Sequence, residues 1–162
     1  SLVGKRILDM GSGSGLLGII AAKRGANVTA VDINHEAVTA IKENAIKNKT
    51  KLNAFESDLF EEINDSFDVI LFNPPYLPTE KNDKFNDVIY SGGKGGREVI
   101  QNFALRSRNF LKKNGKILMI FSSLNDEKKV LELFRRLSFE THILARKKIS
   151  WEELIVIEAV TK

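Results

Sequence analysis

Short apolar runs alternate with amphipathic segments of helical period along this chain of 162 residues. The runs that suit buried strands are Lys5–Met10, Val28–Ile33, Leu52–Glu56, Phe67–Phe72, Lys116–Phe121, Phe139–Arg146 and Glu153–Val160. The segments with an apolar helical face are Leu16–Arg24, His35–Lys49, Arg97–Lys113 and Asn125–Leu137. No helix separates the last two strands, so their short connection can only form a hairpin. The pattern predicts an α/β fold, a doubly wound, mainly parallel seven-stranded sheet with an antiparallel last strand.

The composition is that of an ordinary globular protein, with 43% hydrophobic and 28% charged residues. We expect residues 1–162 to form a single domain. No apolar run approaches the roughly 20 residues that span a bilayer, and no signal-peptide pattern is present, so we expect a cytoplasmic protein. Cysteine is absent and there are only two histidines, His35 and His142, which argues against disulfides and a metal site. The net charge of +4 permits an anionic partner such as RNA without requiring one.

A glycine-rich loop, residues 9–15 (Asp-Met-Gly-Ser-Gly-Ser-Gly), lies between the first predicted strand and the first predicted helix. Glycines at such a turn let the backbone approach a ligand closely. The dinucleotide fingerprint G-x-G-x-x-G requires a third glycine where Leu16 stands, so the loop does not fit NAD. The loop alone also fits an α/β turn without any cofactor.

Acidic residues follow the second and third predicted strands. Asp32 can accept hydrogen bonds from both ribose hydroxyls of an adenosine ligand, and Asp58 can accept from the adenine amino group. Ile33 and Leu59 are apolar neighbours that can sandwich the ring. Together with the three alternate glycines, these residues favour an adenosine-type ligand.

This set of residues resembles the class I S-adenosylmethionine-dependent methyltransferases, and the resemblance covers nearly the whole chain. It implies the strand order 3-2-1-4-5-7-6, with S-adenosyl-L-methionine lying over the carboxyl ends of the first strands and S-adenosyl-L-homocysteine as product. It also implies that Asp9 and the loop backbone face the methionine part. The residues expected to bind the cofactor are Asp9, Gly11, Gly13, Gly15, Asp32, Ile33, Asp58, Leu59 and Asn73.

The motif Asn73-Pro74-Pro75-Tyr76 directly follows the fourth predicted strand. The prolines end the strand and carry no N–H, so this corner presents acceptors. The Asn73 side-chain oxygen and the Pro74 carbonyl can both accept from one planar NH2 group, on which Tyr76 can stack. Such a nitrogen is a weak nucleophile, and two directed acceptors would orient it toward a methyl sulfonium. We expect Asn73, Pro74 and Tyr76 to be catalytic and all four residues to bind substrate; a capped strand end with a packed Tyr76 is the purely structural alternative.

Residues 91–98 (Ser-Gly-Gly-Lys-Gly-Gly-Arg-Glu) complete a second resemblance. Paired with the Asn-Pro-Pro-Tyr motif, they resemble the G-G-x-x-G-R/L stretch of the HemK/PrmC-type release-factor glutamine methyltransferases, in their short archaeal and eukaryotic branch. Family members usually carry a Tyr-x-Pro-like segment before the first strand, and we expect it to be trimmed or missing here. The resemblance implies methylation of the Gln in a Gly-Gly-Gln motif of a class I translation termination factor, giving N5-methylglutamine.

Two other functions fit the same residues. An adenine-N6 methyltransferase acting on RNA or DNA would hold the exocyclic amine of a flipped base in the same corner. A non-enzymatic adenosine-binding module would need no amine-holding corner, so the intact motif argues against it.

The edge of the sheet predicts a partner. In the implied strand order Leu52–Glu56 is an exposed edge strand, which invites strand addition. Relatives of this branch work with a small zinc-binding activator protein, so we expect a heterodimer through this edge. Of the remaining features, the basic cluster at residues 146–148 is expected to be a solvated face, and Trp151 is expected to pack within the hairpin.

Overall fold

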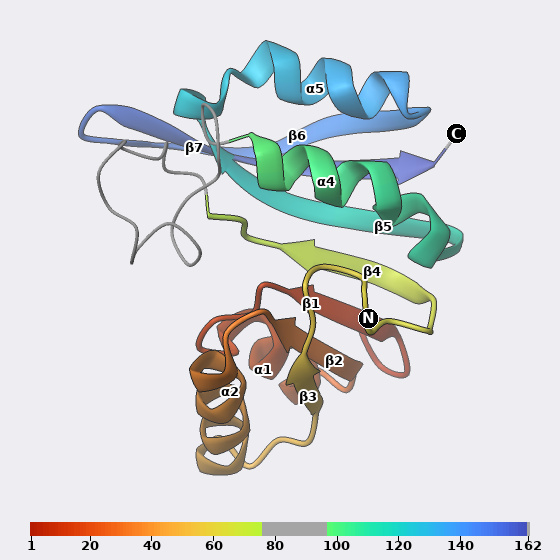
Figure 1. Ribbon diagram of the computed structural model, residues 1–162, viewed down its shortest axis with the longest axis vertical. Coiled ribbons are helices and arrows are strands. Elements are labelled where there is room, and N and C mark those ends of the chain that lie inside the picture. The colour runs from red at the N-terminus through yellow and green to blue at the C-terminus, as the bar shows by residue number, and fades with distance from the viewer. Residues whose placement is uncertain (76–96, 162) are drawn as a thin grey trace. The chain divides into compact units, whose positions relative to one another are not determined.

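The computed structural model describes residues 1–75 and 97–161 (Figure 1). Its strands form one seven-stranded sheet in the order β3-β2-β1-β4-β5-β7-β6. This confirms the predicted fold class and strand order. The chain divides into two compact units, Ser1–Phe72 with Asn109–Ile117 and Asn73–Arg108 with Leu118–Lys162. The expectation of a single domain over residues 1–162 stays a prediction.

The first unit contains the glycine loop and the strands that carry it. Its elements are β1 (Arg6–Met10), α1 (Leu16–Lys23), β2 (Asn27–Asp32), α2 (His35–Lys47), β3 (Asn53–Glu56) and β4 (Phe67–Phe72). Strand β1 pairs in parallel with both β2 and β4, and β3 pairs in parallel with β2. In register, Met10 lies opposite Val31 on one side and Phe72 on the other. The chain therefore leaves β1, β2 and β4 at the same edge, where open α/β sheets bind ligands.

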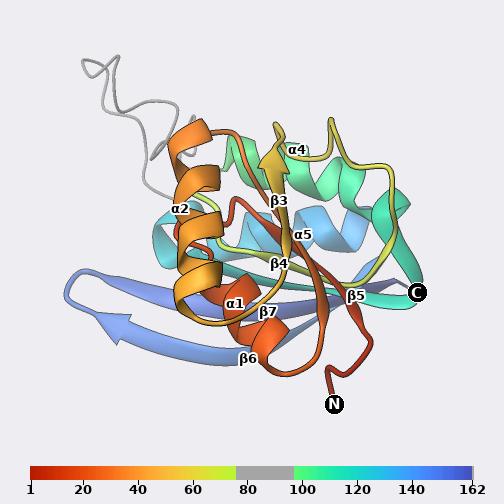
Figure 2. The ribbon, with the colours of Figure 1, turned by 90° about the horizontal axis from the view of Figure 1, so that it is seen from below.

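The second unit contains two helices and a long hairpin. Its elements are α4 (Glu98–Ser107), the end of β5 (Leu111–Ser122), the 3-10 turn η3 (Ser123–Asn125), α5 (Glu127–Arg136), β6 (Phe139–Ile149) and β7 (Glu152–Thr161). Helix α5 begins after Asp126, whose side chain accepts from the Lys129 N–H, and it buries Val130 and Phe134. Strands β6 and β7 pair antiparallel, as predicted. Their ribbon ends in a turn that extends beyond the other described elements of this unit (Figure 1, Figure 2).

The segment between α4 and β5 differs from the prediction. The helix ends at Ser107 rather than Lys113, a short 3-10 turn η2 (Arg108–Phe110) follows, and β5 already begins at Leu111. Phe110 stacks on Phe60 with ring centroids 4.5 Å apart. Its apolar side chain therefore belongs to a long-range ring pair and not to a continued helical face.

Candidate functional site

The glycine loop is held by its own backbone and by two neighbouring side chains. The Ser12 N–H donates to Val31 O over 3.0 Å, and the Gly13 N–H donates to Asp32 Oδ2 over 2.9 Å. The side-chain amide of Asn44, on α2, donates to Ser14 O over 2.8 Å. These bonds tie the loop to β2 and α2 and leave Gly11 and Gly13 exposed to a ligand.

Gly15 cannot be replaced without strain at the end of this loop. It has φ 82°, a left-handed conformation that side chains disfavour, and it is the N-cap of α1. A Cβ at this position would lie 3.2 Å from Ile41 Cγ2. The glycine therefore allows the loop to enter α1 while α2 packs close to it.

Asp9 is the buried acid of the site, with 1% of its surface exposed. Its Oδ2 accepts from the Ser12 hydroxyl over 2.6 Å and from the Gly18 N–H over 2.8 Å. Burial raises the pKa of Asp9 to about 6; the two hydrogen bonds lower it in part, and the charge of Asp32 adds to the rise. Asp9 therefore joins the loop to α1, and its predicted contact with the cofactor stays a prediction.

The close packing of Asp9 against α1 depends on Gly18, which was not among the predicted site residues. A Cβ at Gly18 would lie 3.0 Å from Asp9 Oδ2 and 3.2 Å from Val28 Cγ1. Glycine is disfavoured inside a helix, so its presence at this position was the signal that could have indicated a close approach.

Asp32 lies at the end of β2 and is half-buried. Its Oδ2 accepts from the Gly13 N–H, and its Oδ1 accepts from the Asn34 N–H over 3.0 Å. Each carboxylate oxygen has two acceptor positions, so both oxygens keep one for a ligand. This arrangement fits the two hydroxyls of a ribose.

The segment after β3 lies next to the end of β2. The Ser57 N–H donates to Asp32 O over 3.0 Å, and the Ser57 hydroxyl donates to Leu59 O over 2.8 Å. Asp58 is exposed, and Leu59 is half-buried with the uncommon φ of 48°. Ile33, also exposed, follows Asp32 in the chain. The structure therefore brings together the predicted residues that follow β2 and β3.

Asn73, Pro74 and Pro75 follow β4 directly. Asn73 is exposed, Pro74 is buried and Pro75 is half-buried. Phe72 pairs in register with Met10, so Asn73 is the first residue beyond that pairing. Tyr76 and residues 91–96 of the second motif lie outside the described residues.

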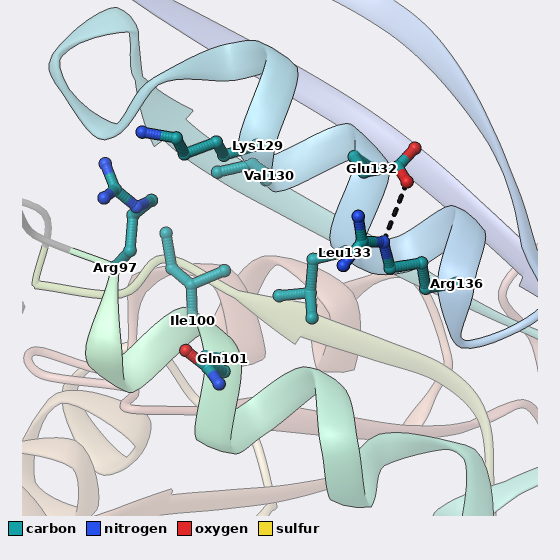
Figure 3. A pocket seen from close by; sticks show the side chains of 8 residues that line it. All are labelled: Arg97, Ile100, Gln101, Lys129, Val130, Glu132, Leu133 and Arg136. Carbon is teal, nitrogen blue, oxygen red and sulfur yellow. Dashed lines mark hydrogen bonds and ion pairs between the residues drawn. The ribbon is translucent and has the colours of Figure 1, made fainter.

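A groove of about 450 Å³ lies between α4 and α5 in the second unit (Figure 3). Ile100, Val130 and Leu133 give it an apolar lining, and Arg97 and Arg136 lie toward its two ends. Glu132 accepts from Arg136 Nε over 2.8 Å across the groove wall. None of the predicted site residues lines this groove, and the sequence reading did not anticipate it.

Residues 1–75 and 97–161 contain neither a metal-binding cluster nor a membrane-spanning helix. Among them, no group of three or more His, Cys, Asp or Glu side chains could hold a metal ion. None of the described helices has the length and hydrophobicity needed to cross a membrane.

Comparisons with known proteins match these features. A protein of Methanocaldococcus jannaschii that carries the provisional name protein N5-glutamine methyltransferase is 46% identical over 159 residues, which are 96% of this chain and 81% of the relative. The release factor glutamine methyltransferase of Lactococcus lactis is 36% identical over 124 residues, 70% of this chain but only 46% of the relative. The chain thus spans about half the length of that bacterial relative.

A solved structure also resembles the whole chain. It is the E. cuniculi Mtq2–Trm112 complex, described as responsible for methylation of the eRF1 translation termination factor, with a TM-score of 0.79 and 28% identity. The match covers 100% of this chain and 88% of that one. The methyltransferase small domain matches residues 2–148. These findings confirm the resemblance seen in the sequence, and the chain belongs to the methyltransferase small domain family.

Proposed function

We propose that this protein transfers a methyl group from S-adenosylmethionine to the side-chain amide nitrogen of a glutamine in a translation termination factor. The observation that carries the proposal is the corner Asn73-Pro74-Pro75, which directly follows β4 at the edge where the glycine loop leaves β1. The names of the M. jannaschii and L. lactis relatives support glutamine as the acceptor. A termination factor is part of the translation machinery, so we place the reaction in the cytoplasm.

The residues of the first unit fit the cofactor. Gly11 and Gly13 are exposed on the loop, Asp32 keeps one acceptor position on each oxygen, and Ile33 and Asp58 are exposed beside it. Under the proposal Asp32 binds the ribose, Asp58 the adenine amino group, and Ile33 and Leu59 the faces of the ring. When bound, S-adenosylmethionine supplies a methyl sulfonium, a strong electrophile that needs no nucleophilic side chain.

Asn73 and Pro74 orient the acceptor. An amide nitrogen is a weak nucleophile because its lone pair is delocalised into the carbonyl. Two acceptor oxygens, one from the Asn73 side chain and one from the Pro74 carbonyl, fix the direction of the NH2 group and stabilise the positive charge that it gains during attack. We expect Tyr76, which lies outside the described residues, to stack its ring on the same planar group.

The test is single-turnover methyl transfer to a termination factor, with RNA and DNA as alternative acceptors. Asn73→Ala should slow transfer about 100-fold or more, because it removes an orienting oxygen and little apolar volume; cofactor affinity is measured in parallel. Asn64→Ala, at another exposed asparagine, is the matched control. Tyr76→Phe should be milder than Tyr76→Ala, since the proposed role belongs to the ring. Turnover near that of the wild type for Asn73→Ala would eliminate the amine-holding role, and transfer to RNA or DNA alone would favour the adenine-N6 alternative.

We also infer a protein partner at β3. Among the described residues β3 pairs only with β2, and it stands at the end of the strand order. An open edge can accept an added strand, and the E. cuniculi neighbour was solved as a two-protein complex. We propose that a small zinc-binding activator binds along residues 52–56. Co-expression followed by size-exclusion chromatography should give a heterodimer, whereas full activity of the isolated monomer would contradict this part of the proposal.

A further inference from the structure

The turn of the β6–β7 hairpin carries the only tryptophan of the chain. Trp151 is 82% exposed, which contradicts the expectation that it packs within the hairpin. It lies with Ser150 in a two-residue turn, where Ser150 has φ 32°. Two-residue hairpin turns favour glycine at a position with positive φ, which here is Ser150, and Trp151 is not among the positive-φ residues. Neither packing nor turn geometry therefore accounts for a tryptophan at this position.

The hairpin end is firmly held against the carboxyl end of β5. The Ser122 hydroxyl donates to the Glu152 carboxylate, and the Glu153 N–H donates to Ser123 Oγ over 2.9 Å. The carboxyl ends of strands in open α/β sheets are where ligands bind. The residue next to Trp151 is thus anchored at the functional edge of its own unit.

Two ion pairs of Arg146 also hold this end of the hairpin. Arg146 pairs with Glu127 of α5 over 2.6 Å and with Glu153 of β7 over 2.8 Å. This links the two strands of the hairpin to the start of α5. An ordered turn loses less conformational entropy on binding than a free loop does.

Two cations near the turn are not neutralised. Lys147 and Lys148 are exposed, and neither side chain has an ion pair or hydrogen bond within the described part of the chain. Arg146, by contrast, is compensated by two carboxylates. The hairpin end therefore presents a large exposed indole beside two lysine side chains that form no ion pair among the described residues. Such a surface complements an acidic patch that also offers apolar side chains, and tryptophan is among the residues that contribute most to protein interfaces.

We propose that the hairpin end, Lys147–Trp151, docks the protein substrate through an acidic and partly apolar patch on that substrate. This rests on the proposed function and adds a specificity surface to it. A protein is favoured over RNA because two free lysines are few for a nucleic-acid interface, which neutralises many phosphates. The names of two relatives also point to protein acceptors.

The kinetic test uses Trp151→Gly and the double variant Lys147→Glu with Lys148→Glu. Trp151→Gly removes a side chain that is 82% exposed, so the fold is retained. We expect KM for the intact termination factor to rise about 10-fold or more, with kcat unchanged. Transfer to a short peptide that contains only the acceptor glutamine should be unaffected. The double variant Lys42→Glu with Lys49→Glu, at two exposed lysines outside the hairpin, is the matched charge control.

A second measurement does not depend on methyl transfer. Because the chain has one tryptophan, 5-fluorotryptophan labelling gives a single 19F resonance that reports on position 151. The resonance should shift or broaden when the termination factor is added and stay unchanged with RNA.

The outcomes separate the two proposals. Wild-type transfer to the factor together with unchanged KM in both variants and an unchanged resonance would overturn the docking surface and leave the proposed function standing. No transfer to the factor by the wild-type protein co-expressed with its activator would overturn the proposed function, and an unchanged resonance in that case would overturn the docking surface as well. A resonance that responds only to RNA would also overturn the assignment to a protein.

Discussion

Burial of Asp9 beneath the glycine loop makes the stability of this protein depend on pH in an unusual direction. The pKa of Asp9 is about 6 in the folded chain against an ordinary 3.8. Between these values the folded state holds a proton that the unfolded state has lost, so the free energy of unfolding falls as pH rises. The shift corresponds to about 3 kcal/mol of stability that is present below pH 4 and lost above pH 6.

Asp9→Asn removes this titration. The asparagine oxygen can still accept from the Ser12 hydroxyl and the Gly18 N–H, so the loop keeps its anchor. The difference in free energy of unfolding between variant and wild type should therefore move in favour of the variant by up to about 3 kcal/mol between pH 4 and pH 7.

Asp68→Asn is the matched control with the opposite sign. The Lys112 ammonium, which is 2.9 Å away, and the Arg6 N–H lower the pKa of Asp68 to about 2. Its stabilisation is present above the ordinary pKa near 3.8 and is lost as pH falls toward 2. The Asp68 variant should therefore gain on the wild type as the solution is acidified.

The assay is urea unfolding followed by far-ultraviolet circular dichroism at a series of pH values from 3 to 8. Equal m-values would show that the variants unfold to comparable states. A flat difference between Asp9→Asn and the wild type from pH 4 to pH 7 would refute the reasoning, because it would mean that burial does not shift the Asp9 carboxyl.

Two other substitutions test the site and the fold. Asp32→Ala should weaken S-adenosylmethionine binding by about 2–4 kcal/mol through the loss of charge-assisted hydrogen bonds; calorimetric titration measures this, NAD serves as the non-binding control, and unchanged affinity would remove Asp32 from the cofactor site. Gly115→Ala should lower the free energy of unfolding by about 1–3 kcal/mol, because its Cβ would lie 2.8 Å from Lys112 O and 2.9 Å from Phe67 O. A Tm equal to that of the wild type would show that the backbone at Gly115 can move away from Lys112 and Phe67 without loss of stability.

The strand order could be predicted because its signals are local. Apolar runs such as Phe67–Phe72, glycine punctuation and the rules for parallel connections suffice to order the strands. The end of α4 could not be predicted in this way. Phe110 and Leu111 continue an apolar helical period in the sequence, yet Phe110 stacks on Phe60, fifty positions earlier in the chain. A local pattern contains no information on such a partner.

The candidate site shows the same difference between features set by local sequence and features set by long-range contacts. The positions of Asp32 and Asn73 follow from strand ends, which the sequence marks. The orientation of Asp9 depends on the missing Cβ of Gly18, and the exposure of Trp151 depends on where the hairpin end is anchored. Both depend on contacts between residues far apart in the chain. The sequence therefore singled out Asp9 and Trp151 but could not predict how each is packed.

At neutral pH the ionised Asp9 lowers the free energy of unfolding. Its two hydrogen bonds do not explain why a carboxylate is present, since an asparagine oxygen can accept both of them. What the carboxylate adds is negative charge beneath the loop. Under the proposed function the ligand on this loop is a sulfonium cation before methyl transfer and a neutral thioether afterwards. We therefore expect Asp9→Asn to weaken binding of S-adenosylmethionine and to leave binding of S-adenosylhomocysteine unchanged when both are titrated calorimetrically above pH 7. Equal losses for the two ligands would show instead that Asp9 only shapes the loop.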